Sequence, residues 1–284
     1  MGNLSIMEQL CFSTTRIETK DINGNSYSGT GFFFSYNLDG NRTMPVIVTN
    51  KHVVKDMVTG QFRMTKADIN GNPLHKDHFQ IQINQFEKCW LFHPDSSVDL
   101  CVCPLAQIVN IAQIQGVSLF YRTFDESLIP NSEKTKTLDA VEDIIMIGYP
   151  NGLWDSVNNM PLIRKGITST DIKLDYEGKK EFLIDAACFP GSSGSPVFVL
   201  NNGSFIDQRN NAVVLGSRLL FIGILYKGAQ YTLSGEIRRN DSTNAVANAM
   251  AYSNSFSNIG YVIKSDMMND FIPYVHDYFK KFNL

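Results

Sequence analysis

The sequence predicts a mainly β protein in two halves, each with enough strands for a small barrel, followed by a C-terminal α-helix. Most of the 284 residues have the period-two alternation and the β-branched and aromatic content of strands, with Asn, Asp and Gly at the turns. The polar stretch from Asp125 to Lys136 contains Pro130 and predicts a linker between the halves. Near the C-terminus, apolar residues recur at helical spacing, at Met268, Phe271, Ile272, Val275 and Phe279.

These patterns divide the chain into three segments. We expect an N-terminal barrel over residues 1–125, a linker and a second barrel over residues 126–264, and a helix over residues 265–284. Ser265 is a candidate N-cap for that helix, and Pro273 predicts that the helix starts late or is kinked.

The candidate strands include nine segments, and the connections between them carry turn residues. The polar segment Ser234–Asn258 predicts a long loop, and the insertion Ser204–Gly216 predicts a lid, a docking surface or a disordered decoration. The strands are expected at Gly31–Tyr36, Pro45–Asn50, Phe79–Ile83, Asp99–Pro104, Asp143–Tyr149, Glu181–Ala187, Pro196–Leu200, Leu219–Lys227 and Gly260–Lys264. Turns are expected at Asn23-Gly24, Asp39-Gly40, Asn70-Gly71, Asn151-Gly152 and Asn202-Gly203.

The composition excludes two classes of partner. Charged residues make up 19%, and 25 Lys and Arg face 28 Asp and Glu, a net charge of -3 that is far from the basic balance of nucleic-acid binding. No apolar run is long enough to cross a membrane, and the N-terminus does not resemble a secretory signal. The five cysteines are odd in number and irregularly spaced, which favours buried thiols in a reducing, cytoplasmic compartment.

A turn of small residues between two strand-like runs is the strongest candidate for chemistry. It reads Cys188-Phe-Pro-Gly-Ser-Ser-Gly-Ser-Pro196. An acyl-transfer nucleophile must stand on a tight turn whose N–H groups point at the developing oxyanion, and flanking glycines permit that geometry. Ser193 is the best-placed hydroxyl, and the N–H groups of Gly191 and Ser193 are the candidate oxyanion donors. The alternative interpretation is a plain hairpin loop.

A serine nucleophile needs a base and a carboxylate that orients the base. His52 follows an apolar strand directly, where a base anchored to the core is expected. Asp99 leads into an apolar run, where an unpaired carboxylate would be costly. A hydrogen bond from a histidine N–H would compensate the charge of this carboxylate. The three residues occur in the order His, Asp, Ser, whereas α/β-hydrolases have the order Ser, Asp, His.

The other histidines have simpler interpretations. His75 and His78 lie three apart in a polar segment, and a zinc site there would need further ligands. His93 and His276 are interpreted as structural residues, and Asp95 as a turn residue.

Several blocks of sequence together resemble one protein family. They are Gly29-Thr-Gly-Phe-Phe-Phe-Ser35, Val46-Ile-Val-Thr-Asn-Lys-His-Val-Val54, Ile147-Gly-Tyr-Pro-Asn-Gly152 with Lys165-Gly-Ile-Thr-Ser169, Asp185-Ala-Ala-Cys-Phe-Pro-Gly-Ser-Ser-Gly-Ser-Pro196, Phe221-Ile-Gly-Ile224 and Ile259-Gly-Tyr-Val-Ile263. The chain resembles a trypsin-like serine peptidase of the chymotrypsin fold, and it is most similar to the HtrA/Deg protease domain without a PDZ domain.

The resemblance implies an all-β fold of two six-stranded antiparallel β-barrels with a C-terminal α-helix. It also implies a serine endopeptidase that uses His52, Asp99 and Ser193 through an acyl-enzyme, with no cofactor and no metal. The primary substrate pocket would have Ala187 at its floor. Its walls would include Leu225, Tyr226, Lys227, Gly228 and Gly260.

The expected specificity follows from these pocket residues. The uncharged floor favours cleavage after small or medium apolar residues. Lys227 would favour an acidic residue if its ammonium turned into the pocket, and a solvated lysine at a strand edge is the alternative. Gly228 would let the substrate main chain pair as an added strand. The expected partners are a protein or peptide substrate and a regulatory protein, and the competing function is a catalytically silent binding module.

Overall fold

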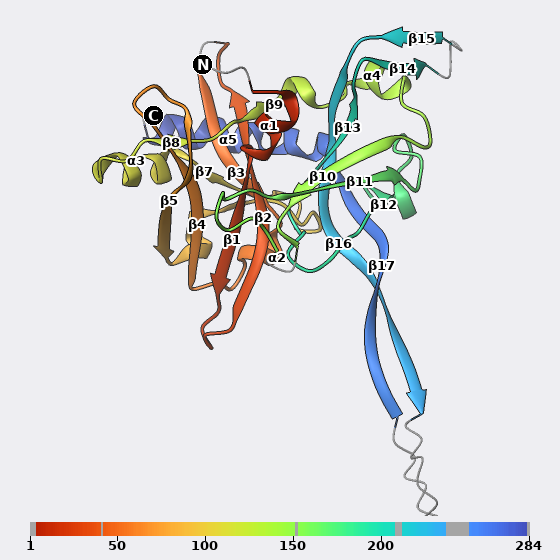
Figure 1. Cartoon of the computed structure of the whole chain (residues 1–284), viewed down its shortest axis with the longest axis horizontal. Coiled ribbons are helices and arrows are strands. Elements are labelled where there is room, and N and C mark those ends of the chain that lie inside the picture. Colours follow the sequence, from red (N-terminus) through yellow and green to blue (C-terminus); the bar gives the residue numbers. More distant parts are fainter. Residues whose placement is uncertain (1–3, 41, 151–152, 208–211, 237–249, 283–284) are drawn as a thin grey trace, which may run out of the picture.

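The computed structural model describes residues 4–40, 42–150, 153–207, 212–236 and 250–282 (Figure 1). The N-terminal half is a nine-stranded sheet, and the C-terminal half is built on a closed six-stranded barrel. The N-terminal elements are α1 (Ile6–Cys11), β1 (Thr14–Lys20), β2 (Ser26–Asn37), β3 (Thr43–Thr49), α2 (Lys51–Val54), β4 (Thr59–Ala67), β5 (Pro73–Asn84), η1 (Phe86–Cys89), β6 (Leu91–Phe92), β7 (Cys101–Pro104), α3 (Ala106–Ile114), β8 (Leu119–Phe120) and β9 (Phe124–Asp125).

The N-terminal half differs from the expected six-stranded barrel. Its sheet runs in the order β5-β4-β1-β2-β3-β7-β6, and the two end strands do not pair with each other among the described residues. Two further strands extend it, because β8 pairs with β4 and β9 pairs with β2. Strands β6, β8 and β9 have two residues each, which is too short to show an alternating pattern in the sequence. The prediction of two closed barrels is therefore wrong for this half.

The C-terminal half contains the closed barrel, in the order β10-β11-β12-β17-β16-β13. Its elements, from the connection onward, are η2 (Glu126–Leu128), α4 (Ser132–Lys136), β10 (Asp143–Gly148), β11 (Leu162–Thr168), η4 (Tyr176–Gly178), β12 (Glu181–Asp185), β13 (Pro196–Asn201), β14 (Ser204–Asp207), β15 (Ala212–Leu215), β16 (Arg218–Glu236), β17 (Met250–Lys264), η5 (Ser265–Phe271) and α5 (Ile272–Phe282). Each of the nine strands expected from the sequence overlaps a strand of the structure.

Two segments expected to be loops contain strands instead. Over Ser234–Asn258 the prediction of a long loop is wrong for the described residues, because they extend β16 and β17 beyond the barrel as an antiparallel hairpin (Figure 1). Within the insertion Ser204–Gly216, β14 and β15 pair as a separate two-stranded sheet. Residues 237–249 and 208–211, between these strands, lie outside the described residues. The side chains that the structure describes on both hairpins are exposed or half-buried, so neither hairpin carries the buried apolar residues that mark a core strand.

The expected glycine turns are present where the structure describes them. Gly24, Gly40, Gly71 and Gly203 have φ between 77° and 84°, the left-handed region that favours glycine. The turn expected at Asn151-Gly152 lies outside the described residues.

The two halves share a hydrophobic core. Phe32 of β2 is fully buried, and its ring centroid lies 5.4 Å from that of Phe221 on β16. The Tyr36 hydroxyl donates a 2.9 Å hydrogen bond to the carbonyl of Met268 in the C-terminal segment. β2 therefore packs against both the barrel and the C-terminal segment.

The C-terminal helix starts late, as Pro273 predicts. A 3₁₀ helix, η5, covers the start of the expected helix, and the α-helix α5 begins at Ile272. Ser265 is not the α-helical N-cap, because it lies inside η5, which is preceded by Lys264. Met268, Phe271 and Val275, three residues of the predicted apolar face, are fully buried. No helix formed by the described residues is long and apolar enough to span a bilayer.

Candidate active site

The histidine and the aspartate predicted from the sequence lie in direct contact. β3 ends at Thr49, and His52 lies on the short helix α2 that follows. Asp99 lies two residues before β7, which pairs with β3, so that the carboxylate is brought beside the helix. The His52 Nδ1 atom lies 2.5 Å from Asp99 Oδ2, and the His52 backbone N–H donates to Asp99 Oδ1 at 3.0 Å. Both carboxylate oxygens thus hold the same residue.

The segment that carries Asp99 is fixed from both sides. The Asn50 side-chain amide donates to the Asp99 carbonyl at 2.8 Å. The Lys51 ammonium donates to the carbonyls of Asp95 and Ser96 at 3.1 and 3.3 Å. Residues next to His52 therefore hold the turn before Asp99, which limits the freedom of the carboxylate relative to the imidazole.

The serine turn adopts a conformation that requires its glycines. Gly191 and Gly194 have φ of 87° and 88°, where a side chain would be strained. A Cβ atom on Gly194 would also lie 1.9 Å from the Thr30 carbonyl oxygen. Among the described residues, the backbone N–H groups of Gly191 and Ser193 donate no hydrogen bond. These two donors are left open for a ligand, as an oxyanion site requires.

Thr30 on β2 joins the serine turn to the half that carries His52. Its N–H donates to the Ser193 carbonyl at 2.8 Å, and its hydroxyl donates to the Gly191 carbonyl at 2.9 Å. The same hydroxyl accepts from the Tyr149 N–H at 3.0 Å. The Thr49 hydroxyl in turn donates to the Thr30 carbonyl at 2.7 Å. This chain of hydrogen bonds links the end of β3, three residues before His52, to the serine turn.

Replacement of Thr30 by valine is expected to destabilise the protein by about 1–3 kcal/mol, because the N–H of Tyr149 and the carbonyl of Gly191 are buried and would lose their partner. The free energy of unfolding in urea measures this effect. Thr30→Ser keeps the hydroxyl and is the matched control. Equal losses for the valine and serine variants would contradict the role given to this hydroxyl.

Ser193 is half-buried, and its hydroxyl points toward β16. It donates a 3.3 Å hydrogen bond to the carbonyl of Tyr226. No hydrogen bond joins Ser193 to His52 among the residues that the structure describes. Contacts between nucleophile and base are often long in unliganded enzymes and shorten when substrate binds.

A cleft of about 530 Å³ opens beside Ser193. Four of the predicted pocket residues line it, namely Leu225, Tyr226, Lys227 and Gly228. The remaining lining residues are Cys188, Phe189, Pro190, Ala229, Gln230 and Tyr261, which sequence reasoning did not assign to the pocket.

The other two predicted pocket residues, Ala187 and Gly260, are not part of the lining. Ala187 is half-buried and presents its carbonyl to Arg164. Gly260 lies directly behind the cleft, since a Cβ atom there would be 2.5 Å from the Cys188 sulfur and 2.7 Å from a methyl carbon of Leu225. Its lack of a side chain therefore leaves room for these two lining residues.

Two polar features of the cleft bear on its chemistry. Lys227 is exposed, and its ammonium lies 5.3 Å from the centre of the Tyr261 ring, a cation–π contact at the rim. Burial raises the pKa of the Cys188 thiol to about 12, so this thiol is neutral near pH 7 and does not compete with Ser193 as a nucleophile.

Arg164 on β11 contacts the serine turn, and no pattern in the sequence marks it. Its guanidinium donates to the Ala187 carbonyl and, at 3.4 Å, to the Ser192 hydroxyl. The same group lies 5.2 Å from the centre of the Phe189 ring. Arg164 thus holds the segment that leads into the turn. The only sequence signal is a pair of basic residues, Arg164 and Lys165, that follows a short apolar stretch and precedes Gly166.

The remaining candidates have other partners. The His78 ring contacts the Arg63 guanidinium, and His75 packs near the Phe12 ring. His93 is buried between backbone carbonyls, and Asp95 accepts hydrogen bonds from Ser97 within its turn. His276 lies half-buried on α5. Within the described residues, no three His, Cys, Asp or Glu side chains are grouped to hold a metal ion.

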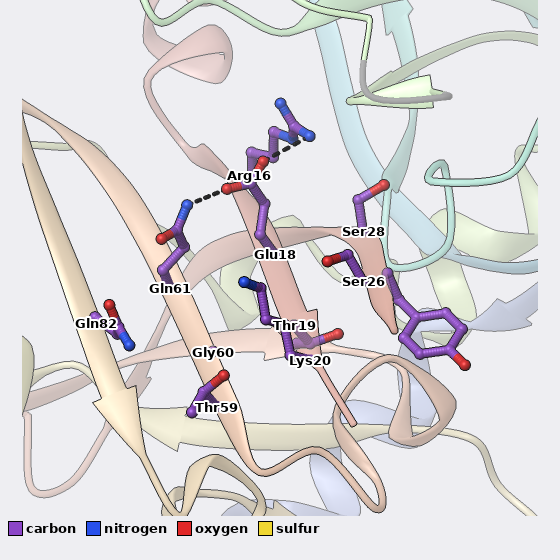
Figure 2. Close-up of a pocket in the computed structure, with 11 residues that line it drawn as sticks. Arg16, Glu18, Thr19, Lys20, Ser26, Ser28, Thr59, Gly60, Gln61 and Gln82 are labelled. Atoms are coloured by element: carbon purple, nitrogen blue, oxygen red, sulfur yellow. Dashed lines mark hydrogen bonds and ion pairs between the residues drawn. The ribbon is translucent and has the colours of Figure 1, made fainter. Parts of the chain in front are cut away.

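A second cavity, of about 440 Å³, lies on β1, β2, β4 and β5 (Figure 2). Glu18 lies between Arg16 and Gln61 there, with a 2.7 Å ion pair to Arg16 and a hydrogen bond from the Gln61 amide (Figure 2). The carboxylate is thus already paired within the protein. None of the three predicted catalytic residues lines this cavity.

The sequence of this chain matches the model of the trypsin-like peptidase domain over residues 29–206. The chain belongs to the trypsin-like peptidase family. The matched segment contains His52, Asp99 and Ser193, and the resemblance inferred from the sequence blocks is confirmed.

Solved structures of proteases resemble this trypsin-like peptidase in fold. One is an HtrA-type protease, AlgW with a tripeptide, at 14% identity and a TM-score of 0.47, covering 96% of this chain and 62% of that chain. Another is the thermostable serine protease AL20 from an extremophilic microorganism, at 11% identity and a TM-score of 0.47, covering 93% and 97%. A third is tobacco etch virus protease complexed with product, at 12% identity and a TM-score of 0.43, covering 90% and 77%. This chain thus spans less than two thirds of the AlgW chain, and no curated protein sequence matches it.

Proposed function

We propose that the protein is a serine endopeptidase with Ser193 as nucleophile, His52 as general base and Asp99 as the residue that orients the base. The observation that carries the proposal is the contact between His52 Nδ1 and Asp99 Oδ2 at 2.5 Å. It commits Nδ1 to the carboxylate and leaves Nε2 to accept a proton from the serine hydroxyl.

In the proposed reaction, Ser193 attacks a peptide carbonyl while His52 takes the hydroxyl proton. The N–H groups of Gly191 and Ser193 donate to the oxyanion of the tetrahedral intermediate. His52 then gives its proton to the leaving amine, which produces an acyl-enzyme. Water, deprotonated by the same imidazole, hydrolyses that ester and restores Ser193.

We further propose cleavage after small or medium apolar residues. Cys188, Phe189 and Leu225 provide neutral side chains to the cleft beside Ser193. The position of the Lys227 ammonium over the Tyr261 ring supports the interpretation of a solvated lysine at the rim, and it does not favour an acidic specificity.

One contact favours the alternative, a catalytically silent binding module. The Ser193 hydroxyl donates to the Tyr226 carbonyl, so that its proton is directed away from the base. In an active enzyme, substrate binding would have to redirect that hydroxyl toward His52.

A fluorophosphonate probe distinguishes these two functions. We expect covalent labelling of Ser193, located by peptide mass spectrometry, because an activated serine with an open oxyanion site reacts with this probe. Ser195→Ala is the matched control on the same turn and should be labelled as fast as the wild type. A folded protein that takes up no probe would support the silent module.

Two other expectations stay predictions. A cytoplasmic location is supported by all five cysteines being free thiols. Control by a regulatory protein partner is proposed because a peptidase in that compartment would otherwise threaten other proteins.

A further inference from the structure

The side chain of His93 is fully buried in the loop that leads to Asp99, with an exposed fraction of 0%. The His93 backbone N–H donates to the Leu100 carbonyl at 3.0 Å, which closes the loop from residue 93 to residue 100. A buried imidazole costs free energy unless its ring nitrogens find hydrogen-bond partners. The partners of the two nitrogens therefore show what this side chain holds in place.

One ring nitrogen of His93 binds the start of the loop. The Asp95 N–H donates to Nδ1 at 3.1 Å. The Asp95 carbonyl, 3.3 Å from Nδ1, already accepts from the Lys51 ammonium at 3.1 Å and from the Val98 N–H at 3.2 Å. Nδ1 is therefore the acceptor for the Asp95 N–H, and the imidazole carries its proton on Nε2.

The other ring nitrogen contacts the C-terminal segment η5. Nε2 donates to the Met267 carbonyl at 3.2 Å and lies 3.4 Å from Asp270 Oδ2. The Phe271 ring meets the imidazole edge-on, with the ring centroids 5.1 Å apart. His93 and Met267 are 174 positions apart in the chain. The imidazole thus bridges the loop of Asp99 and a segment that is formed much later in the sequence.

η5 is anchored to the core independently of His93. The Tyr36 hydroxyl on β2 donates to the Met268 carbonyl at 2.9 Å. Met268 and Phe271 are fully buried in the hydrophobic core that the two halves share. η5 is therefore a fixed support, and a loop that is bonded to it is fixed as well.

The Asp95 peptide group connects His93 to the catalytic pair. Its N–H is bound by His93, and its carbonyl is bound by Lys51, the residue before His52. Asp99, at the end of the same loop, places both carboxylate oxygens on His52. Residues 94–97 are exposed, so packing contributes little to their position. These hydrogen bonds, rather than burial, determine where the loop lies.

We propose that His93 is a positioning residue for Asp99, because it fixes the loop that carries the carboxylate against η5. The inference rests on the proposed peptidase function, in which Asp99 orients His52. His93 contacts none of the reacting groups and acts through the loop alone. Without it, the carboxylate would be held less firmly beside His52, and the orientation and the positive charge of the imidazole would be supported less well.

The first test observes the contact between His52 and Asp99 by proton NMR. A proton in a hydrogen bond of 2.5 Å resonates far downfield of the amide protons, and its absence from Asp99→Asn assigns the signal. His93→Phe keeps a ring beside Phe271 and removes both hydrogen bonds. We expect the signal to move upfield and to broaden in this variant. His276→Phe replaces a half-buried histidine of α5 and is the matched control, which should leave the signal unchanged.

The second test measures kcat/KM against pH. The substrate is a peptide that contains the bond of β-casein, an unfolded protein, that the wild type cleaves fastest. We expect His93→Phe to lower kcat about tenfold with KM unchanged. The acid-side midpoint of the profile should fall by about half a pH unit, because a displaced carboxylate stabilises the imidazolium less. A smaller folded fraction would lower the rate without moving this midpoint, so the midpoint separates positioning from stability.

A milder variant keeps the test decisive if His93→Phe does not fold. His93→Gln keeps a donor near the Nε2 position for the Met267 carbonyl but lacks the Nδ1 acceptor, and it should slow fluorophosphonate labelling of Ser193 about threefold. In the Asp99→Asn background the same change should cause no further loss, because the carboxylate through which His93 acts is absent.

The outcomes separate this inference from the proposed function. A folded His93→Phe or His93→Gln variant with an unchanged NMR signal or an unchanged midpoint would overturn the inference, and so would an additive loss in the double variant. A wild type in which Ser193 takes up no probe would reject the peptidase function. The NMR signal needs no catalysis, so it decides in that case as well whether His93 positions Asp99.

Discussion

Hydrolysis of a peptide substrate is expected to fall by about 10⁶-fold when Ser193 is replaced by alanine. The variant keeps the oxyanion donors, because they are backbone N–H groups, but loses the only atom that can form the acyl-enzyme. Initial rates with β-casein, followed by the release of peptides, measure the loss. The Thr30 contacts to this turn involve the backbone, so the variant should fold normally.

Ser195→Ala is the matched control for that experiment. Ser195 lies on the same turn, is fully buried, and its hydroxyl has no hydrogen-bond partner among the described residues. Removal of a buried, unsatisfied hydroxyl is neutral or stabilising, and activity should be retained. An active Ser193→Ala variant, or an inactive Ser195→Ala variant, would mean that the nucleophile has been assigned to the wrong serine.

Replacement of Asp99 by asparagine is expected to lower kcat by about 10⁴-fold. The carboxylate accepts from the His52 backbone N–H through Oδ1 and faces Nδ1 through Oδ2. An asparagine that keeps the first hydrogen bond presents its NH₂ group to the imidazole. His52 must then carry its proton on Nε2, where it can no longer accept the proton of Ser193.

Asp95→Asn provides the comparison for this variant. Asp95 lies on the turn before Asp99 and accepts from Ser97, and its replacement should leave kcat within about twofold of the wild type. Fluorophosphonate labelling should slow in parallel with kcat in the Asp99→Asn variant. Unchanged kcat in Asp99→Asn would show that another group orients His52.

The elements that could be predicted from the sequence are those with one buried face. β2, β3, β10 and β13 carry apolar runs because they face the shared core or the barrel interior. β1 was missed because its outward face carries Arg16, Glu18 and Lys20 and its inner face includes threonine. The hairpin β14–β15 and the part of β16–β17 beyond the barrel were missed because the side chains that the structure describes there are not buried.

The candidate triad could be proposed from the sequence because each of the three roles needs a particular type of side chain in a particular local setting. Thr30 and Arg164 could not, since they act on backbone carbonyls of the serine turn that only the folded chain brings near. Any donor of suitable length can serve such a carbonyl, so no residue type marks the position. The lining of the cleft was predicted in part. The residues on β16 could be predicted from the family resemblance, whereas Cys188 and Phe189 lie in the segment that leads into the serine turn and were not assigned to the pocket.

The hydrogen bonds of Thr30 also decide when the site can form during synthesis. The Thr30 hydroxyl and the Gly191 carbonyl are 161 positions apart, and the Gly194 N–H additionally needs the Leu225 carbonyl. A ribosome releases the N-terminal sheet first, so His52 and Asp99 can come into contact early. The serine turn gains its hydrogen bonds to Thr30 and Leu225 only later, when both the turn and β16 have been synthesised. The growing chain therefore remains without an ordered nucleophile until β16 has emerged and folded. For the proposed peptidase, this order of folding keeps the nucleophile without its supports until most of the chain has been synthesised.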